Sequence, residues 1–286
     1  MVDADSATKP FERSTEAGKL SDDQVWQEFL TRQRRLRWRR RILPAITLVT
    51  LLVLWEIAVP VFDIKAYVAP APSAIAKVLY SKFGLLMSNL LPTAIEAIGG
   101  FLLGTGAAIL IATLFVYRLT AEEALFPIVV MINAVPIVAK APILVLLLGN
   151  GMAPKIIIAS LICFFPTLVN MTRGLRSVSA QQMELMHVLS ATPREIYFKV
   201  RLKNALPFLF TALKIAAAAS VVGAIVGEWI GASRGIGALI IQATYAFDSP
   251  LLYATIAVGS TFSVAFFSLI AWAERRFLKW NVANSH

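Results

Sequence analysis

The chain has 286 residues, of which 58% are hydrophobic and only 15% are charged, and its formal net charge at pH 7 is +10. Apolar runs of about twenty residues, the length that crosses the hydrocarbon core of a bilayer, recur along the chain and exclude a soluble globular protein. The single cysteine, Cys163, excludes an intrachain disulfide framework, and its place inside an apolar run predicts a buried packing residue.

Residues 1–41 are polar and contain no apolar core of the kind that a secretory signal needs. We expect residues 1–20 to be disordered and residues 22–41 to form a helix. The helix would carry seven arginines, at positions 32, 34, 35, 37, 39, 40 and 41. Because this basic run directly precedes an apolar one, it indicates an anchor at the lipid headgroups rather than a nucleic-acid site.

The apolar runs predict an all-α, polytopic membrane protein with six spans, at about 42–62, 92–116, 125–148, 155–172, 205–231 and 251–273. Between the first two spans, an amphipathic stretch from Ser73 to Leu86 predicts a helix on the membrane surface. After the fifth span, Gly235 and Gly237 precede a short apolar stretch that we expect to fold back towards the bundle.

Basic residues are distributed unevenly over the predicted loops. With the N-terminus placed inside, twenty of the 27 lysines and arginines fall on the cytoplasmic side and five fall outside. This asymmetry predicts cytoplasmic N- and C-termini, with residues 173–204 also in the cytoplasm. The net charge is therefore a signal of topology and says little about a substrate.

A polar segment, residues 179–207, interrupts the apolar chain between the fourth and fifth spans. Ser179 with Gln182, and Thr192 with Glu195, have the spacing of two capping boxes, and Pro193 stands at a first helical position. The segment therefore predicts two short helices joined at a sharp corner, from about 180 to 190 and from about 193 to 204. Such a corner must face water, where it is available to a partner protein.

Among the ionisable residues within the predicted spans, where such residues are costly in lipid and are candidates for function, four stand out: Glu56, Glu96, Lys140 and Glu228. We expect a structural role for Glu56. Our hypothesis is that Lys140 and Glu228 face a central pathway together with Asn133, and that Lys140 attracts an anionic substrate. The alternative is that Lys140 pairs with a carboxylate or reaches along its helix to water.

Small residues and prolines also mark two spans. Gly99, Gly100, Gly104 and Gly106 in the second span predict close helix packing, within the subunit rather than at a seam between two copies. In the third span, Pro127, Pro136 and Pro142 predict kinks. In a pore-lining helix such kinks would leave room for a substrate and for motion, and in a plain bundle they would simply permit tight packing.

The polar segment resembles the coupling loop of ABC importer permeases, whose consensus has Glu-Ala-Ala, three residues, Gly, and a later Ile-x-Leu-Pro. Glu184 matches the Glu, Leu185 and Met186 stand at the Ala positions, Ser190 stands at the Gly position, and Leu202 matches the Leu. Leu206-Pro207, YVAPAPSAI and GEWIGASRGIGALI are similar to the nitrate, sulfonate, taurine and bicarbonate subfamily. The resemblance extends from about residue 67 to residue 280.

This resemblance implies a type I importer permease in a bacterial inner membrane. Its parts would be a cytoplasmic tail (1–41), a first span (42–62), an external segment (63–91), the permease domain (92–273) and a cytoplasmic tail (274–286). Two copies would form the pore, two ATPase subunits would dock, and an external binding protein would deliver the solute. The coupling residues would be Glu184, Leu185, Met186, Ser190, Ala191, Pro193 and Leu202.

The sequence lacks a GxxxxGK[ST] phosphate loop, a nucleophile–base pair and metal-ligand spacing around His187 and His286. We therefore expect no catalytic residue, metal or cofactor, with ATP hydrolysis left to a partner. The subfamily suggests an anionic solute or, as the alternative, an aromatic heterocycle such as a thiamine-precursor pyrimidine or riboflavin. The sequence also leaves open an ion-coupled secondary transporter and a structural membrane protein.

Overall fold

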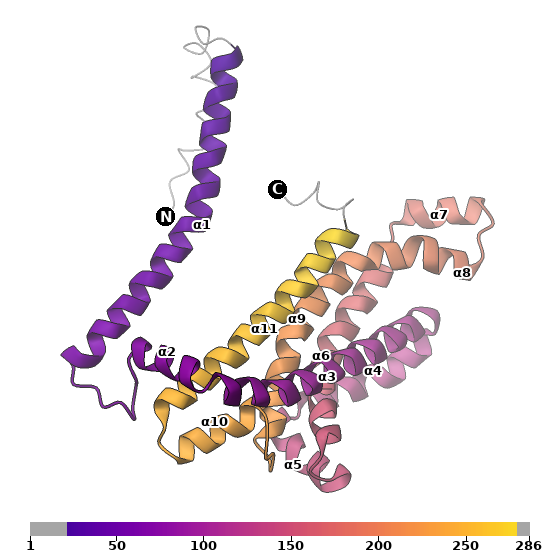
Figure 1. The fold of residues 1–286 in the computed structure, drawn as a ribbon. Helices are drawn as coiled ribbons and strands as arrows, with labels where there is room; N and C mark the ends of the chain where they lie inside the picture. Colours follow the sequence, from indigo (N-terminus) through magenta and orange to yellow (C-terminus); the bar gives the residue numbers. More distant parts are fainter. Residues whose placement is uncertain (1–21, 279–286) are drawn as a thin grey trace, which may run out of the picture. The chain divides into compact units, whose positions relative to one another are not determined.

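The computed structural model describes the backbone of residues 22–278 and the side chains of residues 42–278, and every regular element in that range is a helix (Figure 1). The expectation of disorder over residues 1–20 lies outside the described residues. The chain divides after Asp63 into two compact units. The first unit contains one described helix, α1 (Asp22–Val61), whose portion Ile42–Val61 is long and apolar enough to cross a membrane. This portion agrees with the predicted first span.

The second unit is a bundle built on three long helices, α3 (Phe83–Tyr117), α6 (Met152–Arg176) and α9 (Leu202–Glu228). These three helices make the most extensive contacts with one another, and α11 (Ser249–Phe277) packs on α9. Two short helices, α2 (Pro72–Ser81) and α10 (Ile236–Tyr245), lie against α11 (Figure 1).

Glycines allow the long helices to approach closely. A Cβ atom at Gly100 would lie 2.3 Å from the Cβ of Ala159, and one at Gly104 would lie 2.3 Å from the carbonyl oxygen of Ser160. On α9, a Cβ at Gly223 would lie 2.7 Å from the Cα of Ala159. The prediction that the glycines of the second span serve packing within the subunit is thus confirmed for Gly100 and Gly104, but not for Gly106, where a Cβ would have no atom within 4 Å.

The third predicted span, 125–148, is not one helix. It consists of α4 (Leu119–Ala134) and α5 (Ile137–Leu148), which are bent by 99° at the break between them. Pro136 has no N–H to donate and disfavours the helical conformation of Val135, which is extended at φ −70° and ψ 127°. By contrast, Pro127 and Pro142 lie inside helices. With this pair taken as one span, the structure has six candidate spans, as the sequence predicts.

The helices extend beyond the predicted spans, since α3 begins at Phe83, α6 ends at Arg176 and α11 ends at Phe277. Lys82 separates α2 from α3, so the predicted surface stretch 73–86 divides between the two. The Lys82 ammonium lies 2.9 Å from the Asp248 carboxylate, which also accepts the Leu251 N–H and caps α11. Partial burial raises the pKa of the Asp248 carboxyl, but these two partners outweigh burial and hold the pKa below its ordinary value.

Candidate functional site: a capped corner and a cavity at a broken helix

Both predicted capping boxes of the polar segment are present. The Ser179 hydroxyl accepts the Gln182 N–H, and the Gln182 side chain accepts the Ser179 N–H, at the start of α7 (Ala180–Val188). Thr192 and Glu195 form the same reciprocal pair at α8 (Pro193–Glu195), where Pro193 occupies a first-turn position. The corner between the two helices is therefore specified by local sequence.

The second helix of the polar segment does not end near Asn204, as the sequence suggested. It continues from α8 through a π-helical stretch, η4 (Ile196–Arg201), directly into α9. The Asn204 amide donates to the Gln182 side chain at 2.9 Å, so it joins α9 to α7 instead of terminating the helix. One continuous helix thus connects the corner, at Pro193, with the far side of the bundle, at Glu228.

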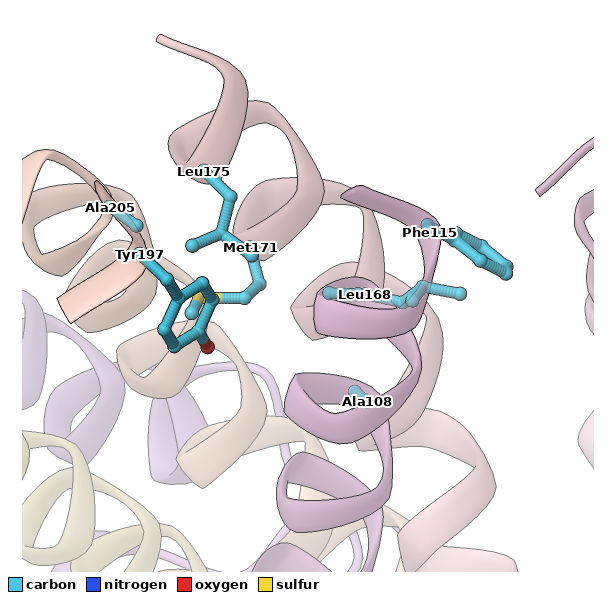
Figure 2. Packing of buried hydrophobic residues seen from close by; sticks show 8 residues of the cluster. Ala108, Phe115, Leu168, Met171, Leu175, Tyr197 and Ala205 are labelled. Carbon is cyan, nitrogen blue, oxygen red and sulfur yellow. The ribbon is translucent and has the colours of Figure 1, made fainter. Parts of the chain in front are cut away.

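A buried apolar cluster anchors this corner to the bundle. Its members come from α3 (Ala108, Ala112, Phe115), α6 (Leu168, Met171, Leu175), η4 (Tyr197) and α9 (Ala205). Figure 2 labels all of them except Ala112. The Tyr197 hydroxyl also lies 2.8 Å from the Thr113 hydroxyl of α3, and Arg201 donates to the Leu175 carbonyl of α6. Because α3, α6 and α9 meet here, a displacement of the corner is resisted by all three helices.

The predicted coupling residues divide into an exposed set and a packed set. Glu184, Leu185 and Pro193 are exposed, while Met186 is buried and Ala191 is half-buried. Leu202 packs against the cluster beneath the corner. Beside Leu185, Val188 and Leu189 are 82% and 65% exposed, so this end of α7 presents an apolar surface that no side chain of residues 42–278 covers.

Ser190 occupies the position at which the resembled loop carries glycine, and the structure shows why glycine suits it. Its φ is 49°, in the left-handed region, where a side chain is disfavoured. This residue reverses the chain after α7, and the Ala191 N–H donates to the Met186 carbonyl across the turn. The corner therefore keeps the glycine-like conformation with a serine in place.

A second candidate region lies at the break between α4 and α5. Asn133, near the end of α4, and Lys140, in the first turn of α5, line one cavity of about 70 Å³. Its other walls are Val129, Ile132, Leu161, Phe164 and Phe165. Irregular backbone at membrane depth is tolerated where it lines a cavity, and here the break brings an ammonium and an amide to one such place.

The structure does not bring Glu228 to this cavity. Its side chain is 1% exposed, one carboxylate oxygen accepts the Thr93 hydroxyl, and the other accepts the Gly237 N–H, both at 2.6 Å. The carboxylate is therefore committed to partners in α3 and α10. The hypothesis that Glu228 faces one pathway together with Lys140 and Asn133 is therefore not supported, because only Lys140 and Asn133 line the cavity.

Sequence reasoning missed three residues of this buried region, namely Asn89, Thr93 and Lys155. Lys155 stands at the very start of the predicted fourth span, and its ammonium lies 3.2 Å from the Glu96 carboxylate inside the bundle. The carboxylates of Glu96 and Glu228 within apolar spans already indicated a buried cation close to them. No local pattern marks Asn89 or Thr93, because their partners are more than a hundred residues away.

Residues 100–279 match the family described as the binding-protein-dependent transport system inner membrane component. The chain belongs to this family. The permease is 32% identical to the formylaminopyrimidine transport permease protein of Halalkalibacterium halodurans, over 83% of this chain and 95% of the relative. It is 31% identical to the riboflavin transport system permease protein of Chloroflexus aurantiacus, over 87% and 93% respectively. A Bacillus subtilis protein assigned to aliphatic sulfonates transport is 28% identical, over 87% and 90%.

The fold of the permease is similar to that of a solved importer. A chain of the MetNI methionine ABC transporter, in an inward-facing crystal form, superposes with a TM-score of 0.54 and 20% identity, over 71% of this chain and 97% of the other. The permease thus has the type I importer fold, and it is a multi-pass inner-membrane subunit of an ABC importer.

Proposed function

We propose that two copies of the permease form the translocation pore and that two ATPase subunits dock on the exposed surface of α7. An external binding protein delivers the solute to the opposite side. The apolar surface formed by Leu185, Val188 and Leu189 supports the docking site, because it needs a partner and lies at a corner tied to three helices. The excess of basic residues at this side supports a cytoplasmic orientation.

The solute is an aromatic heterocycle of the pyrimidine or flavin kind. The observation that carries this proposal is the cavity at the α4–α5 break, where Phe164 and Phe165 lie beside Lys140 and Asn133. Aromatic rings offer an apolar face, while the amide and the ammonium offer hydrogen bonds to ring nitrogens and carbonyls. The relatives that transport riboflavin and formylaminopyrimidine are also more similar to the permease than the sulfonate relative is.

A small sulfonate-like anion is the second candidate solute, and Lys140 is the observation that favours it. The cavity of about 70 Å³ has room for a few water molecules, which is too little for a whole flavin. Its walls therefore contribute to a larger pathway that a second copy completes.

Uptake by the permease, reconstituted with its ATPase and binding protein, tests the two candidate solutes directly. Labelled riboflavin, formylaminopyrimidine, methanesulfonate and nitrate would each be supplied with ATP and without it. ATP-dependent uptake of a heterocycle supports the first candidate. ATP-dependent uptake of methanesulfonate or nitrate, with no uptake of either heterocycle, supports the second. Uptake that an ion gradient drives without ATP would contradict the importer mechanism.

Lys140→Met then separates the roles of the lysine. For an anion we expect uptake to fall about tenfold, since a single well-placed charge contributes on the order of 1.4 kcal/mol. For a neutral heterocycle we expect a change of about threefold or less. Lys77→Met is the matched control, because Lys77 is exposed on α2 and lies outside the cavity. Unchanged uptake of an anion by Lys140→Met would remove Lys140 from the pathway.

A further inference from the structure

The first turn of α10 is held by side chains of two other helices. Three successive backbone N–H groups, those of Gly235, Ile236 and Gly237, donate respectively to Asn89 (2.9 Å), Thr93 (2.8 Å) and Glu228 (2.6 Å). A helix leaves its first N–H groups without partners in the helix, and a neighbouring residue usually caps them. Here the residue at the N-cap, Gly235, makes no side-chain cap, and residues from α3 and α9 perform this role.

The three acceptors form one connected unit, which we call the latch: Asn89, Thr93 and Glu228. The Thr93 hydroxyl donates to the Glu228 carboxylate at 2.6 Å while accepting the Ile236 N–H, so α3, α9 and α10 meet at one oxygen atom. Thr93 and Glu228 are 0% and 1% exposed. No water reaches such a site readily, so each broken bond would leave a buried polar group without a partner.

The glycines beside the latch make this approach possible. Gly235 has a φ of 126°, and a Cβ atom there would lie 2.1 Å from a Glu228 carboxylate oxygen. A Cβ at Gly237 would lie 2.3 Å from the carbonyl oxygen of Ile225, on α9. At Gly237 the backbone of α10 is therefore in direct contact with the backbone of the last turn of α9, and at Gly235 it lies directly against the Glu228 carboxylate.

Glu228 is the last residue of α9, and the other end of the same continuous helix is the polar segment at Pro193. We propose that Asn89, Thr93 and Glu228 are positioning residues that make α10 move with α9 and α3 as one body. A displacement of the polar segment then reaches the far end of the bundle through backbone and buried hydrogen bonds. This inference rests on the chain being a transport permease and does not depend on which solute it carries.

Thr93→Val is the sharpest test, because it keeps the side-chain shape and removes the hydroxyl's bonds to Glu228 and Ile236, together with its bond to the Asn89 carbonyl. Thr93→Ser restores the hydroxyl. Thr105→Val is the matched control, since Thr105 is also buried on α3 and its hydroxyl donates to Phe101 within the same helix. The amount of each variant in the membrane would be measured first, with the wild type alongside.

The first readout is hydrogen exchange at the amides of residues 235–237 in the permease–ATPase complex, without nucleotide and with ATP plus vanadate. In the wild type and in Thr105→Val, we expect these amides to stay protected in both states. In Thr93→Val, we expect exchange to become about tenfold faster. Loss of wild-type protection on nucleotide binding would show that α10 separates from α9 during the cycle, and it would overturn the proposal.

The second readout is the number of solute molecules imported per ATP hydrolysed, with riboflavin as the probe, or another of the four solutes above if only that one is carried. In Thr93→Val we expect this ratio to fall about tenfold while ATP hydrolysis continues, and in Thr93→Ser we expect it to recover. A merely structural role would lower the amount of protein and leave the ratio unchanged. That result, or an unchanged ratio in a fully assembled Thr93→Val, refutes the positioning role.

Failure of the wild type to carry any of the solutes would instead count against the proposed solute.

Discussion

Lys155 and Glu96 form an ion pair inside the bundle, with Nζ and Oε1 3.2 Å apart and the two side chains 8% and 1% exposed. Gly227 allows this pair to lie close to α9, since a Cβ there would be 3.1 Å from the Cα of Lys155. Removing two charges from water is costly, and their attraction offsets that cost only while both remain. Each member is thus needed while the other is present, but the pair is not a large net source of stability.

We expect Lys155→Met to destabilise the permease by about 3 kcal/mol, because it leaves the Glu96 carboxylate buried beside an apolar group. Glu96→Gln should cost less, since it leaves an ammonium beside a neutral acceptor. The double variant Glu96→Met, Lys155→Met should recover most of the loss. Thermal unfolding in detergent measures all three. Additive losses in the double variant would show that the two residues do not act as a pair.

At the scale of elements, the contact between α3 and α6 depends on glycines at defined positions. Gly104 faces the backbone of α6 at Ser160, whereas Gly106, on the same helix, has no atom within 4 Å of a built Cβ. The sequence groups both glycines in one small-residue stripe, yet only one of them serves this contact. Which glycine matters depends on the rotation of α3, and the rotation is set by packing.

Gly104→Ala should therefore force α3 away from α6 and destabilise the bundle by about 2 kcal/mol or more. Gly106→Ala is the matched control, and we expect it to leave stability unchanged or slightly higher. Unfolding temperatures in the same detergent, with solute uptake measured alongside, compare the two. Equal losses in the two variants would show that helix propensity, and not the α3–α6 contact, determines the effect.

At the scale of the whole molecule, the polar segment is linked to the bundle in two ways. The buried cluster under Tyr197 ties it to α3 and α6, and the continuous helix through η4 ties it to α9. A π-helical stretch such as η4 is often found at functional positions. Force applied to α7 by an ATPase would therefore reach all three central helices together.

We expect Glu184→Lys and Leu185→Gly each to uncouple transport, because they alter the exposed surface on which the ATPase would dock. Uptake should fall about tenfold or more while the permease stays in the membrane at the wild-type level. Glu123→Lys, at an exposed position of α4, controls for charge reversal alone. Uptake in proteoliposomes measures the loss of transport, and co-purification of the ATPase measures the loss of docking. Undiminished uptake in both variants would remove the coupling role from this surface.

The sequence by itself determined the features that depend on neighbouring residues. Apolar length predicted the spans, because a bilayer sets the number of residues needed. The two capping boxes predicted the corner, because a side chain reaches the backbone three residues away. Both features were confirmed, and the consensus spacing around Glu184 pointed to the family to which the chain belongs.

Only the tertiary structure decided how distant residues combine. It showed that Pro136 breaks the third span while Pro127 and Pro142 do not, because a break also needs a place for the freed backbone groups. It showed that Glu228 accepts a hydrogen bond from the first turn of α10, and that Lys155 forms an ion pair with Glu96. A buried charge needs a partner, and chain order does not say which one. The partner follows from the rotation and depth of each helix, and these are fixed by packing between helices.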